Sequence, residues 1–236
     1  LVILAYNYLM KNNIQDKTKL VNSVFSKVYK KYDLMNDIMS LGIHRIWKEK
    51  CISWLKPSPN SNLIDVASGT GDIAKLFSNQ IDHSAKITCV EPNNEMFAEG
   101  KKNLKKYKNI KWIKAPAEAL PVKNNSFDYY TISYGIRNVT DINKTLKEAY
   151  RVLKAGGRFM CLEFSKIDNE AINFLYKQYS KIIPLAGKYI VGSSKPYDYL
   201  IESIDSFYNQ KQLCELIKKN GFSNVEYRNL SNGISA

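Results

Sequence analysis

Short apolar runs alternate with longer amphipathic segments through the middle of the chain. The apolar runs are Leu63–Val66, Ile87–Val90, Ile110–Ile113, Tyr129–Ile132 and Phe159–Leu162. Between them, apolar positions recur every three to four residues, which is the period of a helix with one buried face. Alternation of this kind is typical of βαβ units, which build a parallel sheet with helices on both faces. The pattern therefore predicts an α/β fold.

Further helices are predicted on either side of this alternating region. The periodic segments are Lys17–Tyr32 and Ile43–Leu55 before it, and about Ala171–Ile183, Tyr197–Ile204 and Gln210–Lys219 after it. A hairpin of Val225–Leu230 and Gly233–Ala236 is expected to follow, with its last strand antiparallel to the others. Residues 1–16 are expected to be an N-terminal extension outside the fold, and residues 17–236 to form a single domain.

Composition and charge narrow the class of protein. The chain has 236 residues, of which 44% are hydrophobic and 24% are charged, and this suits one globular domain. No stretch reaches the roughly eighteen apolar residues that crossing a bilayer requires. The formal net charge of +13 favours an anionic partner, such as a phospholipid surface, nucleic acid or an acidic protein, without choosing among them.

The four cysteines, Cys51, Cys89, Cys161 and Cys214, lie far apart in the chain. None forms a Cys-x-x-Cys pair, so the sequence argues against a zinc site, and we expect no bound metal. The spacing also argues against a disulfide framework and favours a reducing compartment.

Two glycines stand between the first predicted strand and the helix that follows it. Because they lack Cβ atoms, Gly69 and Gly71 let a ligand lie against the backbone, while free N–H groups at the helix start point towards it. About twenty residues later, the second strand ends in Glu91, whose carboxylate can accept hydrogen bonds from both hydroxyls of a ribose. Loop and acid together predict a nucleotide site. A tight turn that binds nothing is the alternative.

Two classes of nucleotide cofactor are compatible with this loop. Residues 69–74 match the dinucleotide pattern Gly-x-Gly-x-x-Gly only with Ala at its end, and a pyrophosphate would meet Asp72 at the helix start. S-adenosylmethionine has a cationic sulfonium and no phosphate, so Asp65 and Asp72 are acceptable beside it. Residues 65–71 also match the methyltransferase pattern acid-x-Gly-x-Gly-x-Gly, with Ala67 in place of the first glycine. These features favour S-adenosylmethionine.

Longer stretches resemble a known family. Residues 31–48 and 151–165 are similar to the two signatures of the UbiE/COQ5 C-methyltransferases, and residues 134–140 and 199–204 extend the match. The family methylates the ring of a polyprenyl benzoquinol or naphthoquinol in ubiquinone and menaquinone synthesis, with S-adenosyl-L-methionine as cofactor. The resemblance implies a class I methyltransferase fold. This fold is a Rossmann-like seven-stranded sheet, last strand antiparallel, with N-terminal helices and a helical insertion before the C-terminal hairpin.

The resemblance also implies which residues bind the cofactor. To Asp65, Gly69 and Gly71 of the loop pattern it adds Thr70, then Glu91 after the second strand, Pro116 and Ala117 after the third, and Ser133 ending the fourth. The chain departs from the family at Ser68, Ala155 and Pro116, where Gly, Pro and a polar Asn or Asp are usual. Because a polar side chain at position 116 could bond the adenine amino group, its absence would cost about 1 kcal/mol of binding.

Methylation of a ring carbon needs an adjacent phenolate and a close, aligned methyl donor. Arg137, just past the fourth strand, is the candidate to stabilise the phenolate, with Asn138 holding a water or the ring oxygen. The alternative is that Arg137 pairs with Asp128, Asp141 or Glu163 and only fixes the loop.

Residues near the N-terminus are the candidate substrate contacts. Tyr32, Asp33, Met35 and Asn36 are expected to form a lid over cofactor and substrate, although Met35 and Met39 could simply pack their helix against the sheet. His44 could serve as a base. A capping or stacking role is the alternative for His44. Residues 174–191 are apolar enough to hold an isoprenoid tail, or they simply cover the sheet.

The leading hypothesis is a C-methyltransferase that acts on a polyprenyl benzoquinol of the 2-polyprenyl-6-methoxy-1,4-benzoquinol type in ubiquinone biosynthesis, with demethylmenaquinol left open. The rivals are a methyltransferase for another small acceptor, a weakly cofactor-binding scaffold of a quinone-synthesis complex, and an RNA methyltransferase, which no RNA-binding motif supports.

Expected partners are the quinol, a membrane surface in peripheral contact, a quinone-biosynthesis complex and a second copy in a homodimer, but no nucleic acid. Residues 39–42 and 161–165 resemble the eukaryotic branch of the family. They favour the matrix side of the mitochondrial inner membrane, with a bacterial cytoplasm as the alternative.

Overall fold

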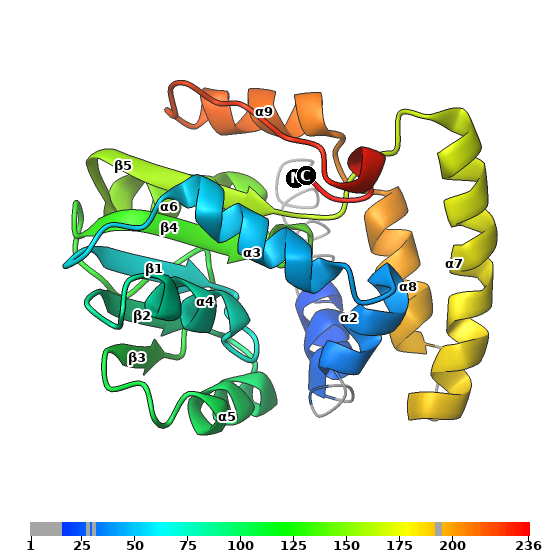
Figure 1. The fold of residues 1–236 in the computed structure, drawn as a ribbon, viewed down its shortest axis with the longest axis horizontal. Coiled ribbons are helices and arrows are strands. Elements are labelled where there is room, and N and C mark those ends of the chain that lie inside the picture. Colours follow the sequence, from blue (N-terminus) through cyan, green and yellow to red (C-terminus); the bar gives the residue numbers. More distant parts are fainter. Residues whose placement is uncertain (1–15, 27–28, 30–31, 192–194) are drawn as a thin grey trace, which may run out of the picture.

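The computed structural model describes residues 16–26, 29, 32–191 and 195–236, and for residues 32, 33, 35, 39 and 181–191 it describes the backbone alone. The expected N-terminal extension therefore lies outside the described residues, apart from residue 16. A central sheet carries helices on its faces and at one end (Figure 1). The single domain expected for residues 17–236 stays a prediction.

Five parallel strands form the sheet, in the order β3-β2-β1-β4-β5. They are β1 (Asn62–Val66), β2 (Lys86–Val90), β3 (Ile110–Ile113), β4 (Phe127–Ser133) and β5 (Leu153–Leu162). Each contains one of the five predicted runs, so the alternating pattern is confirmed. In the central strand, Asp65 pairs in register with Cys89 of β2 and Thr131 of β4. The carboxyl ends of β1, β2 and β4 therefore meet at one edge, where ligands bind in sheets of this class.

Helices bury apolar side chains against both faces of the sheet. Helices α3 (His44–Leu55) and α4 (Asp72–Gln80) pack on one face, α6 (Ile142–Val152) and α9 (Gln210–Lys219) on the other, and α5 (Asn94–Asn103) lies beside β3. Leu55 and Phe77 belong to the first layer, and Leu146 and Ile217 to the second. Because both faces are covered, the strands read as continuous apolar runs.

A third group of helices lies beyond the carboxyl ends of the strands (Figure 1). It consists of α2 (Tyr32–Ser40), α7 (Glu170–Val191) and α8 (Lys195–Asp205). Tyr197 and Leu200 of α8 share an apolar cluster with Trp47 of α3, and the Tyr179 hydroxyl of α7 donates to the Ile38 carbonyl of α2. This group encloses the edge of the sheet where the predicted site lies.

The helices predicted at residues 43–55, 197–204 and 210–219 are confirmed. The helix expected over residues 171–183 runs on to Val191, and the one expected over residues 17–32 is helical at residues 16–26. Tyr32 begins the separate helix α2. Within the described part of the chain, no helix has the length and apolarity that a membrane crossing requires.

The expected seven-stranded sheet is wrong, because the described residues form five strands. The predicted C-terminal hairpin is reduced to two isolated antiparallel bridges, from Phe164 and from Leu230 to Ser235. A tight reversal does follow Leu230, where Ser231 and Asn232 both have positive φ in a 3-10 turn, but the segment before it has no buried face. Residues 223–229 are mostly exposed and lack the alternation that a half-buried strand needs.

Candidate functional site

The glycine loop joins the end of β1 to the first residue of α4. Gly69 and Gly71 both adopt positive φ, of 55° and 90°. A Cβ on Gly71 would lie 2.5 Å from Cδ1 of Leu104, so position 71 requires glycine for both conformation and space. The predicted strand-to-helix turn is confirmed.

Ser68, where the family usually has glycine, ties this loop to β2. Its backbone N–H donates to the Val90 carbonyl (3.1 Å), and its hydroxyl donates to the Asp65 carbonyl (2.6 Å). The same hydroxyl accepts from the Val90 N–H (3.1 Å). Serine at this position therefore adds bonds that hold the loop between the two strands.

Ala67 and Gly135 bring the glycine loop against the loop that follows β4. Ala67 has a positive φ of 52°. A Cβ on Gly135 would lie only 2.6 Å from the Ala67 Cβ. The two loops thus touch at a point where just one side chain fits.

Glu91 follows β2 and is buried beside the glycine loop. Its Oε2 accepts from the Gly69 N–H (2.9 Å), and its Oε1 accepts from the Asn93 N–H (3.0 Å). Burial raises the pKa of Glu91 to about 7, although both N–H groups oppose the rise. Each carboxylate oxygen keeps a second lone pair, so the residue can still accept from a ribose.

Asp65 and Ser133 leave polar atoms without a partner at the ends of β1 and β4. The Thr131 hydroxyl donates to Oδ1 of Asp65 (2.7 Å). Oδ2 of Asp65 and Oγ of Ser133 are buried and have no hydrogen-bond partner among the described residues. Burial raises the pKa of Asp65 to about 7. Buried polar atoms of this kind are rare in native proteins, and they indicate that a ligand with donors completes the site.

A small crevice opens between these groups. It is lined by Lys48, Asp65, Ala67, Ser68, Gly69, Thr70, Asp72, Ile73, Ser133 and Tyr134. Lys48 of α3 donates to Oδ2 of Asp72 (2.7 Å). Burial alone would raise the pKa of Asp72, but the charge and hydrogen bond of Lys48, together with the charges of His44 and Arg45, outweigh burial and lower the pKa. A charged carboxylate at the start of α4 disfavours a pyrophosphate there, as predicted.

The other two predicted cofactor contacts lie after β3. Pro116 is exposed and Ala117 is buried. Neither lines the crevice, and Gly71 and Glu91 do not line it either, although all four follow strands that end at the same edge. Their contact with the cofactor stays a prediction.

Arg137 pairs with Glu163, one of the three acids that the sequence offered. Its guanidinium donates to Oε1 of Glu163 and to the Tyr134 carbonyl (2.9 Å), and both side chains are buried. Burial raises the pKa of the Glu163 carboxyl against the opposing charge of Arg137. Asn138 donates to the same carbonyl (3.3 Å) and accepts from the Tyr199 hydroxyl (2.9 Å). Both residues thus hold the loop from which Tyr134 lines the crevice.

The candidate substrate residues lie around the junction of α2 and α3. His44 is buried, its Nε2 bonds Oδ1 of Asp37 (2.9 Å), and its Nδ1 has no partner among the described residues. Burial lowers the pKa of His44. Asn36 is also buried, with an equally unpartnered Nδ2. The side chains of Tyr32 and Asp33 lie outside the described residues.

The helix of residues 16–26 crosses from the loop after β4 to the segment after β2. Lys17 donates to the Val139 carbonyl (2.7 Å), after β4. Ser26 donates to Oε2 of Glu95 (2.7 Å) and accepts from Asn93 (3.1 Å), after β2. The helix therefore bridges the two loops on either side of the glycine loop.

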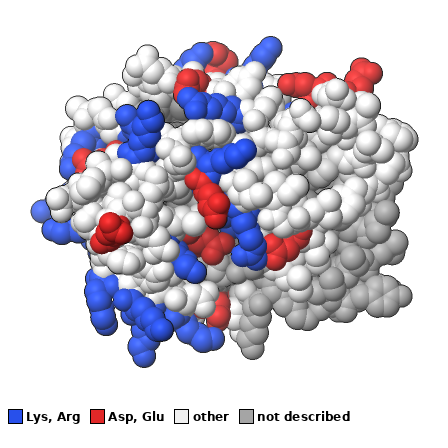
Figure 2. All heavy atoms as spheres, viewed as in Figure 1, with Lys and Arg blue, Asp and Glu red and all other residues white. Residues whose placement is uncertain are grey.

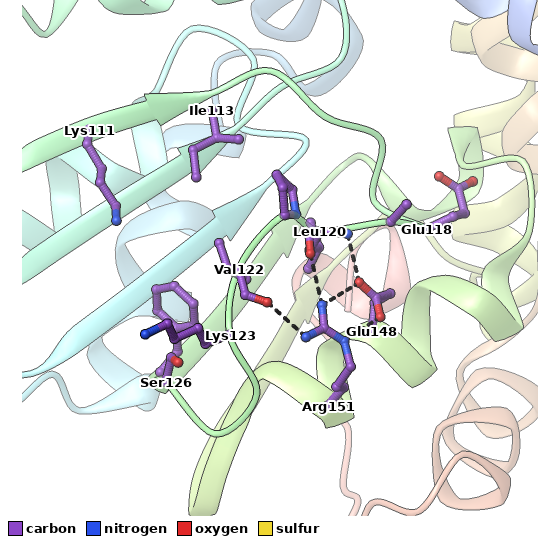
Figure 3. Close-up of a pocket in the computed structure, with 12 residues that line it drawn as sticks. Lys111, Ile113, Glu118, Leu120, Val122, Lys123, Ser126, Glu148 and Arg151 are labelled. Atoms are coloured by element: carbon purple, nitrogen blue, oxygen red, sulfur yellow. Dashed lines mark hydrogen bonds and ion pairs between the residues drawn. The ribbon is translucent and has the colours of Figure 1, made fainter.

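A larger hollow lies away from this crevice, between the β3–β4 connection and α6 (Figure 3). Its volume is about 1020 Å³. Arg151 fills part of its wall, because it bonds Glu148 and the carbonyls of Leu120 and Val122. None of the predicted site residues lines it.

Lys48, a charged crevice residue, was missed by sequence reasoning, as were Ile73 and Tyr134. Lys48 lies within α3, the helix before the first strand, and belongs to none of the loops that follow a strand. The signal available was its place at the end of the 31–48 signature. Membership of that signature does not show where the Lys48 side chain points.

A family model and the sequences of relatives agree on one family. The model of the ubiE/COQ5 methyltransferase family matches residues 11–236. A relative from Rickettsia bellii, named ubiquinone/menaquinone biosynthesis C-methyltransferase UbiE, is 53% identical over 94% of this chain and 92% of its own. One of the same name from Rickettsia prowazekii is 52% identical over 93% and 91%. A solved structure from Thermotoga maritima, described as a SAM-dependent methyltransferase, is 26% identical, with a TM-score of 0.59 over 86% of this chain and 81% of the other.

Proposed function

Because the chain belongs to the ubiE/COQ5 methyltransferase family, we propose that it transfers the methyl group of S-adenosylmethionine to a ring carbon of a polyprenyl quinol. Membership makes it an S-adenosylmethionine-dependent C-methyltransferase of ubiquinone and menaquinone biosynthesis. The preference for a benzoquinol of the 2-polyprenyl-6-methoxy-1,4-benzoquinol type, with demethylmenaquinol as a second substrate, is our proposal.

The observation that carries this function is the set of polar groups that the strand ends and the glycine loop bring together in and beside the crevice. Buried Asp65 Oδ2 and Ser133 Oγ lack donors, and the cofactor has an ammonium group. Glu91 keeps acceptor capacity for ribose hydroxyls beside the Gly69 N–H. The charged Asp72 disfavours a pyrophosphate but is compatible with a cationic sulfonium. We propose that Thr70, Pro116 and Ala117 complete the contacts.

When bound, the cofactor supplies an electrophilic methyl group. The chain must orient the quinol, exclude water and favour loss of a phenol proton whose usual pKa is about 10, judging by tyrosine. We propose that Arg137 supplies positive charge for the phenolate and that Asn138 positions a ring oxygen. The charge of Arg137 is partly neutralised, because Arg137 is paired with Glu163. We propose that Arg137 contributes to the reaction also by holding the Tyr134 loop in place.

The region around α2 supports the proposed quinol site. Asn36 and His44 present unpartnered nitrogens there, and we propose that they contact the quinol together with Tyr32 and Asp33. A His44 with a lowered pKa is neutral at physiological pH, so it can accept a proton through Nδ1. The adjoining helix α7 is our candidate for the isoprenoid tail.

Methyl transfer in vitro tests the proposal. Purified protein with labelled S-adenosylmethionine should methylate a short-chain demethylated benzoquinol at a ring carbon, identified by mass spectrometry, and a demethylated naphthoquinol at its own rate. Arg137→Gln should lower kcat more than 10-fold. Arg151→Gln, which breaks an ion pair far from the crevice, should not. Cofactor binding without methylation of either quinol would favour another acceptor or a scaffold.

We further propose that a membrane surface delivers the substrate to the α2–α3 region. Leu34, Leu41, Ile43 and Ile46 are all exposed there, Leu41 by 72%. On the face that Figure 2 shows, basic residues are spread among acidic ones. Exposed lysines of residues 101–108 lie where α5 leads into β3, at the other end of the strands. Leu41→Gln/Ile46→Gln should therefore reduce flotation with anionic vesicles more than Lys101→Gln/Lys102→Gln. The reverse order would contradict the proposal.

The compared relatives come from Rickettsia, which are bacteria, and so support the bacterial alternative. The expected mitochondrial location receives no support from them. We propose a bacterial cytoplasm as the compartment. A homodimer and membership of a quinone-synthesis complex stay proposals, to be tested by light scattering of the purified protein and by co-purification.

A further inference from the structure

Lys48 is a buried cation that the structure only half pairs. Its side chain is 7% exposed, while that of its partner Asp72 is 36% exposed. An ammonium group has three N–H donors, and among the described residues Asp72 accepts the one hydrogen bond that Nζ makes. Burying a cation is costly unless it is well paired. One half-exposed carboxylate at the rim of the crevice is a weak complement for it.

The same crevice contains a buried acid, Asp65, that lacks a hydrogen-bond donor for one of its oxygens. Asp65 lines it with an oxygen that has no donor, next to the equally unpartnered hydroxyl of Ser133. The Lys48 charge reaches Asp65 and lowers its pKa somewhat against the stronger effect of burial, yet no hydrogen bond joins the two side chains. Cation and anion therefore face one crevice without pairing with each other. A ligand that carries both charges could bond each of them.

We propose that Lys48 binds the carboxylate of the cofactor's methionine part, while Asp65 and Ser133 bind its ammonium group. This rests on the proposed function, because it assigns one end of the same cofactor. The assignment explains why a lysine from α3, outside the sheet, reaches the carboxyl end of β1. It also makes Lys48 a specificity residue, since a cofactor without the carboxylate would leave the ammonium of Lys48 unsatisfied.

Decarboxylated S-adenosylmethionine isolates this contact, because it keeps the adenosine, sulfonium and amino groups. By isothermal titration, the wild-type protein should bind S-adenosylmethionine about 10- to 100-fold more tightly than the decarboxylated analogue, as expected for one charge-assisted hydrogen bond. Lys48→Met should lower affinity for the carboxylated ligand to that of the analogue and leave affinity for the analogue nearly unchanged. Lys75→Met, which removes an exposed lysine of the neighbouring helix α4, should change neither.

Asp72→Asn separates ligand binding from the ion pair. If Lys48 binds the carboxylate, this variant keeps or increases the preference for the carboxylated ligand. A fall to the Lys48→Met ratio would mean that Lys48 acts only through Asp72, and it would overturn the assignment. Equal loss of both ligands in Lys48→Met would do the same.

The wild-type ratio decides even if Lys48→Met does not fold. A wild-type protein that binds both ligands equally overturns the role of Lys48 but leaves the proposed methyltransferase function standing. A wild-type protein that binds neither ligand overturns both.

Discussion

Replacing Asp65 by Asn should make the cofactor-free protein more stable and a poorer cofactor binder. Burial raises the pKa of Asp65 from 3.8 to about 7. Because the folded pKa lies above the unfolded one, the wild type loses stability as the pH rises from about 4 to about 7. At pH 8 the buried charge costs about 4 kcal/mol, and Asn removes that cost. The new amide would lack an acceptor where Oδ2 lacked a donor, which costs about 1–3 kcal/mol.

The net gain is then about 1–3 kcal/mol at pH 8 and close to zero at pH 5, where wild-type Asp65 is already protonated when folded. Urea unfolding of the cofactor-free proteins at both pH values measures it, and titration with S-adenosylmethionine should show weaker binding by the variant. Asp128→Asn is the control, because hydrogen bonds to Lys154 and Asn62 outweigh burial and lower the pKa of Asp128. Its substitution should cost stability above pH 4 and little below. Equal destabilisation by Asp65→Asn at pH 5 and pH 8 would refute the reasoning.

Three further substitutions test other parts of the site. Gly71→Ala should cost about 2–3 kcal/mol of stability in urea unfolding, because alanine would adopt positive φ and its Cβ would clash with Leu104. In a Leu104→Ala background, the same substitution should cost less. An equal cost in both backgrounds would place the whole loss in the backbone. Arg137→Ala should cost about 3–5 kcal/mol because it leaves buried Glu163 without its cation, and adding Glu163→Gln should recover stability, which an additive loss would contradict. Glu91→Gln can accept from only one of two N–H groups, so S-adenosylhomocysteine should bind about 10-fold more weakly in titration; unchanged affinity would remove Glu91 from the ribose site.

The strands were predictable because a strand that is buried on both faces has a nearly continuous run of apolar residues. The run Leu63–Val66 is almost fully buried in β1, and every other run also falls within its strand. The end of the chain was not predictable in this way. Whether residues 225–236 form a ladder depends on a buried face for the first strand to pack against, and in the structure residues 223–229 are mostly exposed.

The site was predictable where it is local in sequence. Gly69, Gly71 and Glu91 could be identified by residue type and by distance along the chain, and the structure joins Gly69 and Glu91 by a hydrogen bond. Lys48 enters the crevice from a helix packed across the sheet, so only the tertiary fold reveals it. Arg137 shows the converse limit. Its partner Glu163 was one of three acids that the sequence could offer, and packing made the choice.

The close approach of Ala67 and Gly135 determines the order in which substitutions at these two positions can occur during evolution. Gly135 has φ −114° and ψ −30°, a conformation open to any residue, so its main obstacle is the neighbouring methyl group at position 67. A chain that first undergoes Ala67→Gly loses both that obstacle and the strain of a left-handed alanine, and position 135 is then released to vary. In the opposite order, the first substitution places a Cβ at position 135 against the methyl group of Ala67. Evolution can therefore pass through the variant with glycine at both positions, but not through the variant with a side chain at both.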